Sequence, residues 1–209
     1  MADVTTALIK ELRDATNAGM MDAKRALEAT DADIEKAKDW LRQKGITKAA
    51  ERAGRSTAQG IVESYIHTNK QVGVLLEINS ESDFVARNEI FQTLARELCL
   101  QIAGLAPLYV RREEVPSALV EREKAVGLAQ LREQGKPEAM LEKIVTGKLN
   151  AFYAEICLLE QKWVKDDKRT VQSLIDEAVA QLKENIQVSR FVRFKVGESP
   201  VVDLTAGEE

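Results

Sequence analysis

The sequence predicts an α+β fold, in which an N-terminal bundle of three helices precedes a core of helices packed on a small antiparallel sheet. Two observations support this prediction. Apolar residues recur every three or four positions through the first 45 residues, whereas alternation with a period of two begins at Ile61 and returns near Val188. Strands that bracket a run of helices are typical of helices packed on an antiparallel sheet.

The first 45 residues contain three apolar stripes with helical spacing, separated by turn residues. The third helix is expected to begin after a capping aspartate, Asp31 or Asp33, and to close at Gly45. Residues 1–46 are therefore expected to form a separate bundle. The three stripes are Val4, Leu8 and Leu12; Ala23, Ala26 and Leu27; and Ile34, Ala37, Trp40 and Leu41.

Residues 47–60 lose this periodicity and become small and polar, which predicts a linker that lets the bundle move relative to the α+β core at 61–197. Residues 198–209 are expected to form a flexible tail. The elements expected in the core are strands over 61–67 and 72–78, helices starting near Asn88, Pro116, Pro137 and Thr170, a brief strand at Leu108–Val110, and a last strand over 188–196.

Composition argues against several classes of function. The net charge is −4, no apolar run approaches the roughly 18 residues of a membrane span, and the N-terminal residues lack a signal peptide's apolar centre. Cys99 and Cys157 lie in apolar helical patterns and are expected to be buried thiols in a reducing compartment. The single histidine, His67, has no ligand cluster around it, so we expect no metal site. The chain is expected to act in the cytoplasm of a bacterium, or in an organelle after processing.

Two rival functions follow from the residues alone. Residues 36–55 contain seven Lys or Arg against two acidic residues, which allows a ubiquitin-like or RNA-binding adaptor. A run of this kind is usually a solvated helix face, and no aromatic residues interleave it for base stacking, so direct nucleic-acid binding is not expected. A helical enzyme would need a nucleophile–base pair, a metal cluster or a phosphate loop, and the sequence shows none of these patterns.

Asp83 and Phe84 follow the apolar run 72–78 within a polar turn. Only 5% of the residues are aromatic, so a phenylalanine beside a carboxylate in a turn needs an explanation. Phe84 either folds back as a lid on the core or anchors the chain in a partner's pocket, since aromatic residues dominate interface hot spots.

Met20 and Met21 open the second helix directly after a glycine. One of the two must point outward, because adjacent helical positions do not share a face. An exposed methionine beside a tight turn offers an adaptable binding surface, and plain core packing is the alternative.

Four segments, in order, resemble translation elongation factor Ts. They are residues 12–27 (LRDATNAGMMDAKRAL), 79–86 (NSESDFVA), 158–166 (LLEQKWVKD) and 191–194 (FVRF). The resemblance extends over about residues 2–198. Two positions depart from the family pattern: Asn17 stands in place of a glycine, and Ser82 stands in place of a threonine but keeps a hydroxyl.

The resemblance implies a guanine-nucleotide exchange factor for elongation factor Tu, with no covalent chemistry and no cofactor of its own. It implies that the first 45 residues form a ubiquitin-associated-like bundle that docks on the partner's nucleotide domain. The implied docking residues are Leu12, Arg13, Met20 and Met21. The implied exchange wedge, which enters between partner helices near the Mg²⁺ and phosphate site, consists of Ser82, Asp83, Phe84 and Val85.

The resemblance also bears on assembly. Longer family members carry a second, related half of the core and a helical hairpin, and this chain resembles the short class that lacks them. A face that the second half covers there is expected to be apolar and exposed here, so we expect a homodimer and a two-to-two complex with elongation factor Tu. The stripe Leu141–Leu159 and the strand Val188–Val196 are the expected faces; alternatively, the stripe packs on the chain's own sheet.

Overall fold

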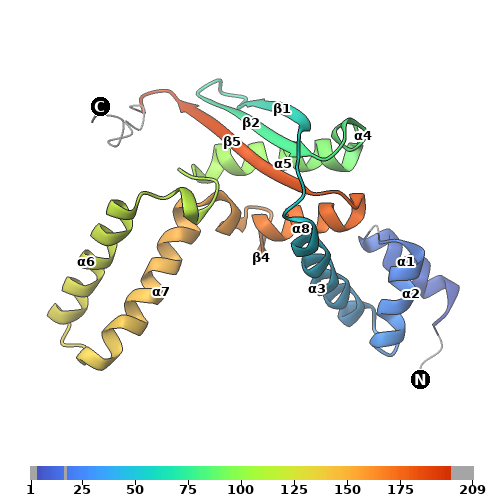
Figure 1. The fold of residues 1–209 in the computed structure, drawn as a ribbon, viewed down its shortest axis with the longest axis horizontal. Helices are drawn as coiled ribbons and strands as arrows, with labels where there is room; N and C mark the ends of the chain where they lie inside the picture. The colour runs from blue at the N-terminus through green and yellow to red at the C-terminus, as the bar shows by residue number, and fades with distance from the viewer. Residues whose placement is uncertain (1–3, 17, 199–209) are drawn as a thin grey trace.

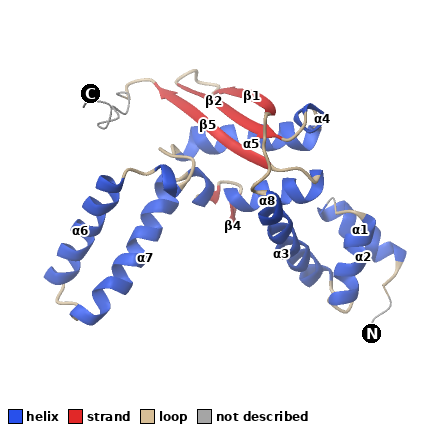
Figure 2. Cartoon of the chain, viewed as in Figure 1, coloured by secondary structure: helices blue, strands red, loops and turns tan. Residues whose placement is uncertain are grey.

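The computed structural model describes residues 4–16 and 18–198, and it confirms the α+β class (Figures 1 and 2). The helices are α1 (Thr6–Thr16), α2 (Met20–Ala29), α3 (Ile34–Arg52), α4 (Asp83–Ala86), α5 (Glu89–Leu105), α6 (Ser117–Glu133), α7 (Glu138–Ile156) and α8 (Val171–Leu182), with 3-10 turns at Arg112–Glu114 and Leu158–Glu160. The strands are β1 (Gln59–Ile66), β2 (Val72–Ser80), β3 (Lys162–Trp163), β4 (Asp166–Thr170) and β5 (Ile186–Lys195).

Helices α1, α2 and α3 form the expected bundle around their own apolar cluster, which includes Leu12, Ala23, Ala26, Leu27 and Ala37. The cap at the start of α3 is Asp33, whose carboxylate accepts a hydrogen bond from the Lys36 backbone N–H at 3.0 Å.

The expectation that Gly45 closes the third helix is wrong, because α3 continues to Arg52. Gly45 lies where α3 crosses α8, and a Cβ added to it would lie 3.5 Å from the Cβ of Ala180. Its small size serves close helix packing here, and one turn later Ala49 is buried in the main core. Only residues 53–58 of the expected linker lie outside helix and strand, so a continuous helix joins the bundle to the core.

The main sheet has the strand order β1–β2–β5, with both pairs antiparallel. Helices α5 and α8 lie on one side of it (Figure 1). Residues on that side, such as Val74, Leu76 and Ile78 of β2, are buried. A bulge at Ser189 shifts the register, because Glu77 pairs with Arg190 while Ile78 pairs with Val188.

Helices α6 and α7 form an antiparallel hairpin that extends away from the sheet (Figure 1). The expectation that the chain lacks a helical hairpin is therefore wrong. Pro116 and Pro137 precede the two helices as expected. The apolar stripe of α7 packs inside the hairpin, where Leu141 and Val145 join Leu131 in a separate buried cluster. Because this stripe is covered, it is not a free face for a second copy.

The smaller expectations have mixed outcomes. Thr170 caps α8 as expected, accepting from the Ser173 backbone N–H at 3.2 Å. In place of the brief strand at Leu108–Val110 there is a single parallel bridge between Tyr109 and Cys157. The expected tail lies outside the described residues beyond Glu198, as does Asn17. In the described parts of the chain, no helix is long and apolar enough to cross a bilayer.

Candidate partner-binding site

Phe84 lies in the first turn of the four-residue helix α4, and 81% of its surface is exposed. The neighbouring residues determine its direction. Val85 is 9% exposed and joins the main core, so the adjacent Phe84 is directed away from that core. The lid interpretation is wrong, because a lid on the core would be buried.

Ser82 starts the helix as its N-cap and accepts a hydrogen bond from the Val85 backbone N–H at 3.4 Å. The preceding strand ends at Ser80, which is fully buried and donates its hydroxyl to the Ser82 carbonyl at 2.8 Å. The turn after β2 is thus fixed by two serine side chains.

Glu184, in the loop between α8 and β5, holds this turn from the other side. Its carboxylate accepts from both the backbone N–H and the hydroxyl of Ser82, at 2.9 and 2.6 Å. One residue on, the Asn185 backbone N–H donates to Glu81 at 2.6 Å. Sequence analysis missed Glu184 and Asn185, which lie about 100 positions away, and no local pattern points to them.

Asp83 and Arg87 form an ion pair at 3.0 Å, one helical turn apart. Both side chains are about half exposed or more, so the pair is screened by water and contributes little to stability. The Asp83 carboxylate is therefore free to exchange Arg87 for a polar group on a partner.

In the bundle, Met20 and Met21 are 61% and 58% exposed. We expected one of them to face outward, and the structure shows that both do. The alternative of core packing is therefore wrong. Arg13 is also exposed, and its Nε donates to the Ala18 carbonyl at 3.4 Å across the turn. Leu12, in contrast, is fully buried in the bundle. It belongs to the bundle's core and has no exposed area to offer a partner.

The other candidate chemical groups are metal-binding side chains, His67 and the two cysteines. The described residues contain no group of three or more His, Cys, Asp and Glu side chains that could hold a metal ion. His67 exchanges a hydrogen bond with the Tyr65 hydroxyl at 2.8 Å. Burial raises the pKa of Cys99 to about 12 and that of Cys157 to about 11, so neither thiol is primed as a nucleophile.

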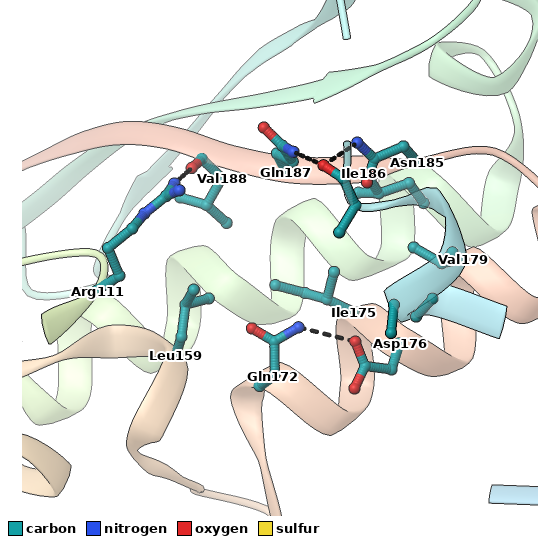
Figure 3. A pocket seen from close by; sticks show the side chains of 13 residues that line it. Arg111, Leu159, Gln172, Ile175, Asp176, Val179, Asn185, Ile186, Gln187 and Val188 are labelled. Atoms are coloured by element: carbon teal, nitrogen blue, oxygen red, sulfur yellow. Dashed lines mark hydrogen bonds between the residues drawn. The ribbon is translucent and has the colours of Figure 1, made fainter. Parts of the chain in front are cut away.

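A pocket of about 330 Å³ lies between α3, α8 and the start of β5 (Figure 3). Its polar groups are largely engaged with one another. Gln172 donates to Asp176 at 2.8 Å, and Arg111 donates to the Val188 carbonyl at 2.9 Å. Around them the lining is mostly aliphatic, including Ile175 and Leu159, and the pocket offers no convergent set of free polar groups.

Comparison with known proteins identifies the family. A profile of the family described as Elongation factor TS matches residues 4–198. The chain belongs to the elongation factor Ts family. The Elongation factor Ts of Anaeromyxobacter sp. (strain K) is 52% identical over 198 residues, which cover 95% of this chain and 90% of that protein. The Elongation factor Ts of Thermosipho melanesiensis is 51% identical over 195 residues, which cover 93% of this chain and 100% of that protein. The Elongation factor Ts of Geobacter metallireducens is 53% identical over 195 residues, which cover 93% of this chain and 90% of that protein.

Elongation factor Ts is the guanine-nucleotide exchange factor of elongation factor Tu, so this family has a protein partner. Exposed apolar side chains lie at α4, where Phe84 is exposed, and at the start of α2, where Met20 and Met21 are exposed.

Proposed function

We propose that this chain releases GDP from elongation factor Tu by docking its bundle on the nucleotide domain and wedging Asp83 and Phe84 near the Mg²⁺ and phosphate site. The observation that carries the proposal is the exposure of Phe84 on a short helix that Ser82 and Glu184 hold from both sides. A large aromatic side chain kept in water by a fixed support is typical of an interface anchor.

The energetics require both contact sites. Accelerating release by roughly 10⁴-fold means lowering the barrier by about 5.5 kcal/mol. Burying one phenylalanine contributes only about 1.5–3 kcal/mol. Docking through Arg13, Met20 and Met21 supplies binding energy that holds the wedge in place. Because binding is reciprocal, a factor that prefers the empty partner must weaken nucleotide affinity equally.

Release of a fluorescent GDP analogue from elongation factor Tu tests the wedge. The chain is expected to accelerate release, and Phe84→Ala to slow the accelerated rate roughly 10- to 100-fold, from the burial lost. Asp83→Ala should cause a smaller decrease in the accelerated release rate, and this decrease should depend on salt concentration. The matched control is Met140→Ala, since Met140 is 52% exposed on α7, far along the chain from both sites. Unchanged release with Phe84→Ala would remove Phe84 from the mechanism.

We also propose that the active form is a homodimer that gives a two-to-two complex. In support, the sheet face opposite α5 and α8 exposes apolar side chains beside the ion pair of Glu77 with Arg190, and the described residues place no helix on it. The register brings Leu75 beside Val192 and places Ile66 in line with Phe194, across the three strands. Five apolar side chains of this face are 41–69% exposed: Val62, Ile66, Leu75, Val192 and Phe194.

Two such faces can pack as a sandwich of two sheets. An isolated apolar patch of this kind otherwise promotes non-specific association. Light scattering at micromolar concentration tests the proposal. The expected mass is twice 23.2 kDa, and Phe194→Asp, which buries a charge in the sandwich, should return the protein to a monomer. A wild-type mass near 23.2 kDa that persists as concentration rises contradicts the dimer.

A further inference from the structure

A cleft of about 910 Å³ separates the bundle from the core, where the α1–α2 turn and α3 face β4 and α8. Its volume lies in the range of small-molecule sites. Across it, the Gln181 side-chain amide donates to the Thr16 carbonyl at 3.3 Å, which links the two walls.

The charge of this cleft is opposite to that of the chain, whose net charge is −4. Seven cationic side chains line the cleft, against only two carboxylates. The cations are Arg13, Arg25, Lys38, Arg42, Lys44, Arg169 and Lys183, and the carboxylates are Asp22 and Glu177.

Three of the cations are neutralised by nearby carboxylates: Lys38 by Glu35, Arg42 by Asp39 and Arg169 by Glu177. The other four form no ion pair with any residue that the structure describes. These are Arg13, Arg25, Lys44 and Lys183. They come from α1, α2, α3 and the end of α8, so the uncompensated positive charge is spread over both walls.

Two further features favour an anion. The N-terminus of α2 opens beside the cleft at Gly19 without a side-chain hydrogen bond from its cap, and its positive dipole end faces one carboxylate of the first turn, Asp22. At the other wall, burial raises the pKa of Glu177, although Arg169 and Arg42 act in the opposite direction. Charges in that partly dehydrated part of the cleft interact more strongly than on an open surface.

The distribution of the cations indicates the ligand's shape. The unpaired cations come from four different elements on both walls, including Arg25 of α2 and Lys183 at the end of α8. A ligand that carries several negative charges along a chain matches this distribution better than a single phosphate does. Half-buried Trp40 and Leu41 add an apolar strip beside Lys44, whose Nζ lies 5.6 Å from the Trp40 ring centroid. We propose that the cleft binds the phosphate chain of an oligophosphate, either inorganic or carried by a nucleoside.

Arg13 belongs to both this cleft and the proposed docking surface, so a bound oligophosphate should compete with the partner. That consequence rests on the proposed function, whereas binding itself does not. Binding is therefore tested on the free full-length chain, without elongation factor Tu.

The experiment is calorimetric titration with inorganic tripolyphosphate at fixed ionic strength, with Trp40 fluorescence as a second readout. We expect saturable binding of one ligand per chain. The double variant Arg25→Gln/Lys183→Gln should lower the affinity for tripolyphosphate about tenfold or more, because hydrogen bonds between charged groups are stronger than those between neutral groups. Lys124→Gln/Lys143→Gln, two exposed residues of the hairpin, is the control with the same charge change and should bind as wild type.

Three results would overturn the proposal. The first is that tripolyphosphate binding does not saturate, and the second is that both double variants weaken it equally. The third is that single-stranded RNA binds more tightly than tripolyphosphate and that Arg25→Gln/Lys183→Gln abolishes this RNA binding. Titration with ATP distinguishes the two sources of the phosphate chain, inorganic and nucleoside-borne. Tighter binding of ATP that Trp40→Phe weakens identifies a nucleoside-borne ligand, while equal affinity for both identifies the phosphate chain alone. Either result supports the site.

Discussion

At the scale of single residues, exposure distinguishes the side chains that are proposed to meet a partner from those that lie in a core. Phe84, Met20 and Met21 are exposed, whereas Val85 and Leu12 are buried. The exposed Phe84 is thus held beside a buried neighbour, Val85, whereas the exposed methionines lie on a bundle whose core includes Leu12. Substitutions of the exposed residues should alter binding with little effect on the free energy of unfolding.

Glu184 is predicted to act on exchange through Ser82. Glu184→Gln keeps the shape but leaves one acceptor oxygen for two donors, so it should lower the free energy of unfolding by about 1 kcal/mol and slow GDP release. Glu142→Gln on the hairpin is the control. Urea denaturation and the release assay measure the two effects. Wild-type values in both assays would show that the carboxylate does not hold the wedge.

The two cysteines give a prediction about pH. Burial, with a smaller effect of Glu63, raises the pKa of Cys99 to about 12, and burial with Glu160 raises that of Cys157 to about 11. The thiolate is the reactive form, so a disulfide-exchange reagent at pH 8 should react with the native protein far more slowly than with the urea-unfolded chain. The rate should rise as pH increases. Rapid reaction of both thiols in the native state at pH 8 contradicts this.

At the scale of elements, α3 determines how the bundle is attached. The sequence indicated a helix up to Gly45 because glycine usually ends a helix. It could not indicate that Gly45 faces Ala180 of α8, since the crossing of two helices distant in the chain leaves no local signal. For the same reason the hairpin was missed: Pro116 and Pro137 marked two helix starts, but not that α6 and α7 pair with each other.

Gly45 provides a stability test of this crossing. A Cβ at Gly45 would sit 3.5 Å from Ala180, an ordinary contact, so Gly45→Ala should raise the free energy of unfolding by about 0.5–1 kcal/mol. Gly45→Leu should lower it, because a larger side chain separates α3 from α8. Gly147→Ala, with nothing within 4 Å of the added Cβ, controls for helix propensity. Equal tolerance of Ala and Leu at Gly45 would mean that the helices do not cross closely there.

At the scale of the whole molecule, the proposed contact surfaces lie on separate parts: the bundle, helix α4, and the sheet face opposite α5 and α8 (Figure 1). The sequence predicted the α+β class and the antiparallel hairpin of β1 and β2, because period and turn signals are local. It also singled out Phe84, Met20 and Met21, which the structure shows to be exposed. It did not predict Glu184, whose contact with Ser82 exists only once α8 and β5 have folded against β2.

The central proposal is that the bundle binds elongation factor Tu, whereas the wedge of Asp83 and Phe84 accelerates the release of its GDP. The rate of GDP release from elongation factor Tu, measured over a range of chain concentrations, separates the two. Met20→Ala/Met21→Ala should raise the half-saturating concentration and leave the limiting rate near wild type. Phe84→Ala should lower the limiting rate roughly 10- to 100-fold with a smaller change in half-saturation. If Phe84→Ala changed only half-saturation and kept the full limiting rate, Phe84 would be a docking residue and the account of the wedge would be wrong.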